Sequence, residues 1–233
     1  MLDAATRPIT ARWPATRPDR IQLYSNPTPN GIKVSAMLEE TGLPYEPHFI
    51  PLDQTTTPEF LSLNPNNKIP AIVDPDGPGG RPLPLWESGA ILIYLAEKTG
   101  RFLPADPAAR YETLQWLMFQ MGGIGPMFGQ MGFFVKLGGK DIEDPRPRDR
   151  YIAEAARLLN VLDGRLEGRD WIMGDDYTIA DMAIWPWIRT LTGFYGASEL
   201  VGYDRFTNIH PWMERALARP ASLAALNIPA RNG

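Results

Sequence analysis

The sequence predicts an α/β domain followed by an all-α domain, and three observations support this. Residues 21–100 alternate short strand-like runs with helix-like stretches. After "RFLPADP" (101–107) the pattern becomes wholly helical. The 233 residues are 44% hydrophobic and 21% charged, a globular composition long enough for a substantial core. We therefore expect an extension at 1–20, an α/β domain at 21–100, a linker at 101–107 and a helical domain at 108–233.

The first part follows the order βαβαββα. Strands are expected at 21–24, 45–52, 71–74 and 82–87, and helices at 30–41, 58–64 and 88–100. Gly42 and Gly100 end two of these helices, and "PDGPGGRP" joins the last two strands as a hairpin. This order implies a mixed four-stranded sheet with helices packed on it.

The second part is predicted from helical spacing and caps. Apolar positions recur at helical spacing in 108–136, but "GGIGPMFGQMG" predicts a broken or closely packed helix end there. "RDRYIAEAARLLNVLDGRLEG" predicts an amphipathic helix. Thr178 and Asp181 form a capping box, so a structural role for Asp181 is favoured over a functional one.

The terminal segment and the net charge exclude several classes of protein. Residues 1–20 are rich in Arg, Pro and Ala but lack the apolar core of a secretory signal. We expect a poorly ordered tail there, with Trp13 as the residue that docks. The net charge of −4 gives no reason to expect nucleic acid, and no apolar run reaches the roughly 18 residues that cross a membrane.

The chain contains no cysteine. It therefore has no disulfide, no thiolate metal site and no thiol nucleophile of its own, which fits a reducing cytosol. The two histidines, His48 and His210, are far apart and have no ligand-like neighbours. Neither a metal site nor a Ser-His-Asp triad is expected.

"PTPNG" (27–31) occupies a strand-to-helix junction. Thr28 is a good N-cap, and Pro29 suits the first helical position because its missing N–H would be unpaired there. Asn30 and Gly31 tolerate tight backbone geometry. By itself the motif predicts a turn.

Two further motifs carry possible binding groups. In "NNKIPA", Pro70 is a candidate cis proline that would turn the backbone groups of Ile69 outward, although a trans loop proline fits equally well. Lys68 beside it would by itself be a solvated charge. In "WESGAI", Glu87 and Ser88 open a helix, a favourable place for a carboxylate ligand, although a simple cap is the alternative.

Taken together, "PTPNG", "NPNNKIPAIVD", "ESGAILIYLAEKTG" and "LQWLMFQMGGIGPMFGQ" resemble the glutathione transferases from about residue 20 onward. Within that superfamily the motifs are most similar to the bacterial nu class. The resemblance implies a thioredoxin-like N-terminal domain and an all-helical C-terminal domain. It also implies a cytoplasmic homodimer that binds glutathione or glutathione disulfide and needs no metal.

The resemblance also assigns the glutathione contacts. Ile69, ahead of Pro70, would pair through its main chain with the cysteinyl part. Glu87 and Ser88 would hold the ammonium and carboxylate of the γ-glutamyl end. Lys68 would lie near the glycyl carboxylate.

The resemblance extends to one residue of the helical domain and breaks down in one loop. Arg157 corresponds to an arginine that reaches the partner's glutathione in nu-class dimers, and its alternative is a surface arginine. The loop "LDQTTTPEF" departs from the family pattern in length and residues. That departure leaves Gln54 and Thr55 without a firm assignment.

The predicted mechanism depends on a thiolate. A free thiol titrates near 8.5, and donors at a helix start lower that pKa. The resemblance places the Thr28 hydroxyl and the Asn30 amide at the glutathione sulfur, in preference to Tyr24 and Ser25. The expected reactions are thiol–disulfide exchange or removal of glutathione from thioether conjugates, a lyase activity that yields glutathione disulfide. The alternatives are conventional conjugation to electrophiles and a non-catalytic interaction module.

An apolar or disulfide co-substrate is expected to lie against the helical domain. The helical domain carries a stripe of Met and aromatic residues that could line its binding pocket. A stripe of this kind is more often core than pocket, but the glycines around it favour soft pocket walls. The candidate pocket residues are Met127, Phe128, Met131, Phe134 and Tyr195.

Overall fold

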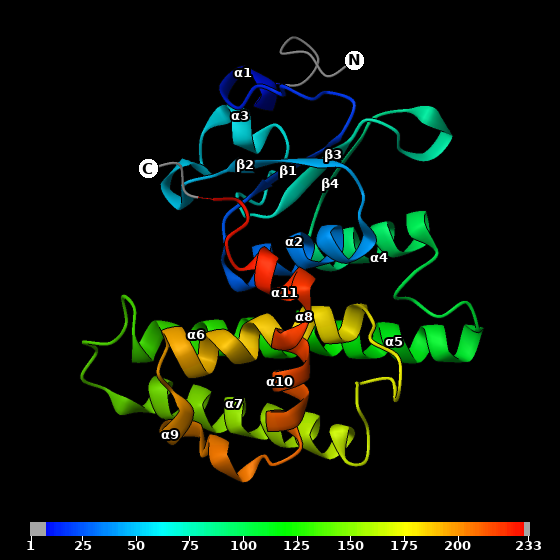
Figure 1. Ribbon diagram of the computed structural model, residues 1–233. Coiled ribbons are helices and arrows are strands. Elements are labelled where there is room, and N and C mark those ends of the chain that lie inside the picture. Colours follow the sequence, from blue (N-terminus) through cyan, green and yellow to red (C-terminus); the bar gives the residue numbers. More distant parts are fainter. Residues whose placement is uncertain (1–7, 231–233) are drawn as a thin grey trace. The chain divides into compact units, whose positions relative to one another are not determined.

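The computed structural model describes residues 8–230 and divides into two compact units. Residues 8–99 and 220–230 form one unit, and residues 100–219 form the other (Figure 1). The last helix, α11 (Pro220–Ala225), packs on α2 (Pro29–Thr41) of the α/β unit. The sequence grouped α11 with the helical domain, because a chain that returns to an earlier domain leaves no local signal.

The α/β unit contains the predicted mixed four-stranded sheet. Its spatial order is β2-β1-β3-β4, with β1 and β2 parallel and the other neighbours antiparallel. The strands are β1 (Ile21–Ser25), β2 (Tyr45–Phe49), β3 (Ala71–Asp74) and β4 (Leu83–Trp86). The predicted hairpin between β3 and β4 is confirmed.

Helices cover both faces of this sheet (Figure 1). On one face, α1 (Ile9–Arg12) and α3 (Pro58–Leu61) pack with buried side chains of β1 and β3. On the other, α2 lies beside α4 (Ser88–Thr99). Short 3-10 turns span Leu52–Gln54 and Pro78–Gly80.

The prediction of a poorly ordered tail is wrong for residues 8–20, which fold onto the sheet. Trp13 packs against the buried cluster around Phe60 with an edge-on ring contact of 6.4 Å between centroids, as its predicted docking requires. The Arg12 guanidinium donates to Gln54 Oε1 at 3.1 Å. The rest of the tail lies outside the described residues.

The second unit consists of helices joined by loops, one of which contains an isolated β-bridge between Trp171 and Gly174. Its helices are α5 (Pro107–Phe119), α6 (Gly125–Val135), α7 (Pro145–Leu166), α8 (Ile179–Arg189), α9 (Ser198–Val201) and α10 (Ile209–Ala218), with π-helical turns at Gln120–Ile124 and Thr190–Phe194 and a 3-10 turn at Tyr203–Arg205. The first π turn interrupts the helix at the predicted break. The amphipathic helix begins at 145, earlier than predicted, because the Asp144 carboxylate caps it by accepting from the Arg146 N–H at 3.0 Å.

Asp181 organises the core of the helical unit. Its carboxylate accepts hydrogen bonds from the Thr178 N–H at 3.0 Å, the Ile172 N–H at 2.9 Å and Trp212 Nε1 at 2.9 Å. The predicted capping box is therefore confirmed. The Thr178 hydroxyl donates a fourth hydrogen bond to it at 3.2 Å. Asp181 is fully buried, and this burial raises its pKa, although the four hydrogen bonds oppose the rise.

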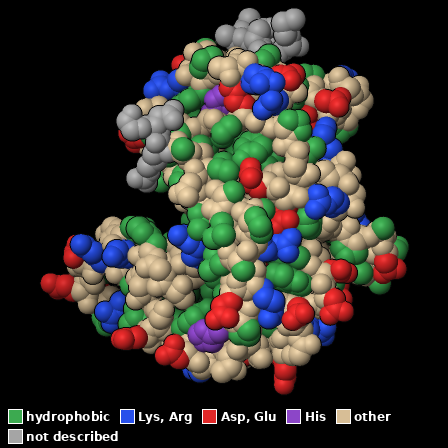
Figure 2. Space-filling view, viewed as in Figure 1, with side chains coloured by type: hydrophobic (Ala, Val, Ile, Leu, Met, Phe, Trp, Pro, Cys, Tyr) green, Lys and Arg blue, Asp and Glu red, His purple; other side chains and the backbone are tan. Residues whose placement is uncertain are grey.

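The surface carries both signs of charge. On the face seen in Figure 2, Lys and Arg side chains are interspersed with Asp and Glu, without a continuous patch of either sign. Among residues 8–230, no helix combines the length and the apolar character that crossing a membrane requires.

Candidate functional site

The three predicted glutathione motifs leave the sheet at one row of paired residues. Ala71 at the start of β3 pairs with Tyr24 near the end of β1 on one side. On the other side it pairs with Trp86, the last residue of β4. "PTPNG" follows this row after β1, Ile69-Pro70 precedes it, and Glu87-Ser88 follows it after β4. Strand register alone therefore brings the motifs to one edge of the sheet.

The β1–α2 junction is held by main-chain and side-chain hydrogen bonds. Thr28 is the N-cap in extended conformation, and its Oγ1 accepts from the Gly31 N–H at 3.4 Å. The Thr28 N–H donates to the Asn26 carbonyl at 2.6 Å, and the Asn26 side chain donates to the Ile50 carbonyl at 3.0 Å. The Thr28 hydroxyl thus accepts inside the cap and keeps its own hydrogen for donation.

The alternative groups at this junction are buried. Tyr24 has no exposed area, and its ring stacks on His48 at 4.6 Å between centroids. Ser25 is also fully buried, and its hydroxyl lies 3.5 Å from the Asn26 carbonyl. Thr28 and Asn30 are both partly exposed, so they are more accessible to a ligand than Tyr24 or Ser25.

The Ile69–Pro70 peptide bond is cis, which resolves the alternative that the sequence left open. Both residues are buried and precede the first paired residue of β3. The loop before them is fixed by Asn64, whose side chain donates to the Lys68 carbonyl at 2.6 Å. The Lys68 side chain is exposed.

Glu87 and Ser88 differ sharply in environment. Glu87 is exposed and has a φ of 71°, in the left-handed region that non-glycine residues rarely adopt. Such backbone strain concentrates at functional sites. Ser88 is the first residue of α4 and is only 4% exposed.

Lys33 lies beside the predicted site residue Ser88, a neighbour that sequence reasoning missed. It lies on α2, has no exposed area, and donates from Nζ to Ser88 Oγ at 3.2 Å. Burial lowers its pKa from 10.5 to about 7, although the nearby charge of Glu87 raises it. A lysine within a mostly apolar stretch of helix, "GIKVSAML", was the available signal.

The loop residues Gln54 and Thr55 have structural partners. Gln54 accepts from Arg12, and Thr55 is 7% exposed and donates from its hydroxyl to the Leu52 carbonyl at 3.0 Å. Both side chains therefore have hydrogen-bond partners within the α/β unit.

In the helical unit, Arg157 lies on the exposed side of α7. It pairs with Glu154 of the same helix at 2.7 Å, and 59% of its side chain is exposed. Arg157 is thus at the surface and remains accessible in the described chain.

The candidate pocket residues separate into two groups. Phe128 and Met131 have no exposed area and belong to the core, the alternative that the sequence left open. Tyr195 is 9% exposed, with its ring so close to Gly132 that a Cβ there would lie 2.2 Å from the ring. Met127 and Phe134 are partly exposed.

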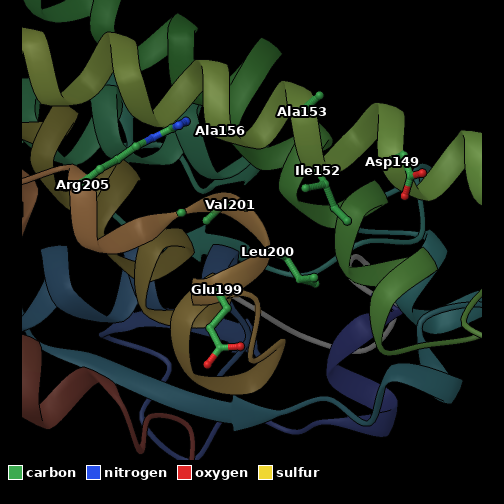
Figure 3. A pocket seen from close by; sticks show the side chains of 9 residues that line it. Asp149, Ile152, Ala153, Ala156, Glu199, Leu200, Val201 and Arg205 are labelled. Carbon is green, nitrogen blue, oxygen red and sulfur yellow. The ribbon is translucent and has the colours of Figure 1, made fainter.

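A separate open pocket of about 470 Å³ lies on the helical unit between α7 and the α9 segment (Figure 3). Its apolar lining includes Ile152 and Leu200, and its charged lining consists of Asp149, Glu199 and Arg205. It contains none of the residues that the sequence assigned to glutathione. Among residues 8–230, no group of three or more His, Cys, Asp or Glu side chains is placed to hold a metal ion.

Family models identify both parts of the chain. Residues 28–98 match the glutathione S-transferase N-terminal domain, and residues 133–220 match the C-terminal domain. The chain belongs to the glutathione S-transferase family.

Two bacterial relatives support this assignment. The chain is 46% identical to the disulfide-bond oxidoreductase YfcG of Escherichia coli, over 88% of this chain and 94% of that protein. It is 42% identical to the disulfide-bond oxidoreductase YghU of the same organism, over 86% and 72%.

Two solved structures are closely similar along nearly the whole chain. A glutathione transferase of Burkholderia graminis, with two glutathione molecules bound per subunit, is 64% identical with a TM-score of 0.96, covering 99% of this chain and 97% of that one. A glutathione transferase of Pseudomonas putida, with one glutathione disulfide per subunit, is 60% identical with a TM-score of 0.95, covering 98% and 100%.

Proposed function

We propose that this protein is a glutathione-dependent disulfide reductase of nu-class type, in which the glutathione thiolate is stabilised at the start of α2. The observation that carries the proposal is the row Tyr24–Ala71–Trp86, from which all three motifs leave the sheet at one edge. The names of the oxidoreductase relatives and the glutathione-bound structures support it.

Each motif takes one part of glutathione. The main chain of Ile69 pairs with the cysteinyl part, and Lys68 attracts the glycyl carboxylate. Glu87 pairs with the γ-glutamyl ammonium, while Ser88 and the first N–H groups of α4 bind its carboxylate.

The sulfur lies at the β1–α2 junction in this proposal. The Thr28 hydroxyl and the Asn30 amide donate hydrogen bonds to it, and the α2 dipole adds positive potential. Hydrogen bonds that favour the charged form lower the pKa of the thiol below about 8.5.

Two glutathione molecules complete the reaction. The first thiolate attacks one sulfur of the substrate disulfide, forming a mixed disulfide and expelling a substrate thiolate, which takes up a proton. The second glutathione thiolate attacks the glutathionyl sulfur of that mixed disulfide. Glutathione disulfide and the second substrate thiol leave, so two glutathiones are oxidised as one disulfide is reduced.

The lyase reaction uses the same site. A glutathione thiolate attacks the sulfur of a thioether conjugate, the carbon–sulfur bond breaks, and the carbon leaving group takes up a proton. The alternatives remain conventional conjugation and a non-catalytic module. The absence of cysteine from the whole chain favours reactions in which glutathione supplies the sulfur.

We further propose a cytoplasmic homodimer in which Arg157 reaches the partner's glutathione. Exposed apolar residues on α5, such as Tyr111 at 72% and Met118 at 51%, provide a surface for such an interface. Sedimentation of the purified protein tests the dimer.

A panel of substrates tests the reaction. The purified protein is supplied with glutathione and, separately, with hydroxyethyl disulfide, aryl thioether conjugates and a chlorodinitrobenzene. Production of glutathione disulfide with the first two supports reduction or lyase activity. Activity with the chlorodinitrobenzene alone would favour conjugation, and a calorimetric titration without glutathione binding would favour the interaction module.

A further inference from the structure

Lys33 is a buried ionisable group that the proposed reaction does not use. It lies 55 residues from Ser88 in sequence, yet its Nζ is 3.2 Å from Ser88 Oγ. Lys33 has no exposed area, and Ser88 is 4% exposed. Burying a lysine costs stability, because its charged form loses hydration that neighbouring groups must replace.

We propose that Lys33 is a positioning residue of the γ-glutamyl subsite, an inference that rests on the proposed function. Its ammonium group donates to Ser88 Oγ and thereby directs the Ser88 hydroxyl hydrogen toward the ligand carboxylate. Lys33 itself does not contact the ligand.

The hydrogen-bonding capacity of the two groups supports this direction. An ammonium group has donors and no acceptor, so Ser88 Oγ must accept in this contact. A hydroxyl that accepts at one lone pair points its single hydrogen elsewhere. Ser88 is the first residue of α4, where the helix dipole favours an anion.

The charges around Lys33 make its protonation depend on the ligand. Burial lowers its pKa to about 7, and the charge of Glu87 opposes this. The neighbouring helix α4 also carries Glu97 and Lys98 near its end, whereas the described sequence of α11 has no ionisable side chain. A ligand carboxylate at Ser88 favours the protonated form of Lys33, so binding near pH 7.5 takes up protons.

Two glutathione analogues isolate the carboxylate. Glutaryl-cysteinylglycine keeps the carboxylate of the γ-glutamyl end but lacks its ammonium, and 4-aminobutyryl-cysteinylglycine has the reverse. The dissociation constants of glutathione and both analogues are measured by calorimetry for the wild type, Lys33→Met, Ser88→Ala and the double variant.

Lys33→Met is expected to raise the dissociation constants of glutathione and the glutaryl analogue about tenfold, because a charge-assisted hydrogen bond is lost. The dissociation constant of the aminobutyryl analogue should change less than twofold. In the Ser88→Ala background the same substitution should lower the affinity for glutathione less than twofold, because Lys33 acts through Ser88. An equal loss for the aminobutyryl analogue, or an undiminished loss in the Ser88→Ala background, overturns the proposal.

Proton uptake by the wild type gives an independent readout. S-methylglutathione, whose sulfur does not titrate, is bound at pH 7.5 in two buffers of different ionisation enthalpy. We expect the binding heat to differ between the two buffers by the amount that proton uptake on binding requires. Equal heats in both buffers would overturn the proposal. This measurement applies even if Lys33→Met does not fold.

Lys98→Met is the matched control. It removes a lysine from the last turn of α4, where Nζ pairs with Asp74 at 2.9 Å, and should change glutathione affinity less than twofold. Failure of the wild type to bind glutathione would overturn the proposed function itself. Normal wild-type binding that Lys33→Met leaves unchanged would overturn only the role of Lys33.

Discussion

A Cβ atom at Gly31 would lie 2.0 Å from the carbonyl oxygen of Asn26, and 2.6 Å from Ser25 Oγ. The start of α2 therefore packs directly on the end of β1, at a distance that only glycine allows. The Thr28 N–H also donates to the Asn26 carbonyl, so the same oxygen fixes the cap and limits residue 31. This contact sets the position of Thr28 and Asn30.

Gly31→Ala is expected to destabilise the protein by about 2–3 kcal/mol, because the backbone must move to relieve the overlap. Activity should fall in parallel, since that movement displaces Thr28 and Asn30. Urea unfolding and turnover measure the two effects. Gly164→Ala on α7, where an added Cβ meets nothing within 4 Å, is the control and should leave both unchanged or improve stability slightly.

Thr28→Ala should lower turnover about 100-fold, the usual effect of losing one aligned donor to a developing anion. It should also cost about 1 kcal/mol of stability, because Thr28 is the N-cap of α2. Thr28→Ser keeps both the hydroxyl and the cap, and should retain most of the activity. Equal activity in all three proteins would exclude a role for the hydroxyl.

Glu87→Gln should weaken the binding of glutathione about tenfold, because the charge that pairs with the ligand ammonium is lost. Glutaryl-cysteinylglycine, which lacks that ammonium, should bind both proteins equally. Calorimetric titration makes the comparison. A similar loss for the two ligands would show that Glu87 does not contact the ammonium.

Lys33 should make the stability of the protein depend on pH. Its pKa is about 7 in the folded protein and 10.5 as the reference value, so between these pH values the unfolded state binds more protons. Stability therefore rises with pH in this window, by at most about 1.4 kcal/mol per unit. Lys33→Met should remove this rise and stabilise the protein at pH 7.

The difference between wild type and Lys33→Met isolates this contribution from other titrating groups. Urea unfolding at pH 7, 8 and 9 measures it for both proteins. Parallel dependence on pH in the two proteins would contradict the low pKa of Lys33.

Much of this architecture could be predicted because its signals are local. The strand at 71–74, the capping box at Thr178 and the break after 119 each depend on spacing, caps or glycine within a few residues. The sequence also indicated the cis bond before Pro70, although it left the trans form open.

The features that sequence reasoning missed depend on contacts between distant segments. The Lys33–Ser88 hydrogen bond spans 55 residues. The return of α11 to α2 is likewise non-local, and the Ser35 hydroxyl there donates to the Ile228 carbonyl at 3.0 Å. The fold of the N-terminal segment depends on the packing of Trp13 against Phe60. None of these pairings leaves a periodic or capping signal in the sequence.

The pKa of the bound glutathione thiol tests the central claim most directly. It is measured from the ultraviolet absorbance of the thiolate as a function of pH, in the wild type and in the Thr28→Ala, Asn30→Ala double variant. We predict a midpoint clearly below about 8.5 in the wild type and a return toward that value in the folded double variant. The same lowered midpoint in both proteins would contradict thiolate stabilisation at the start of α2.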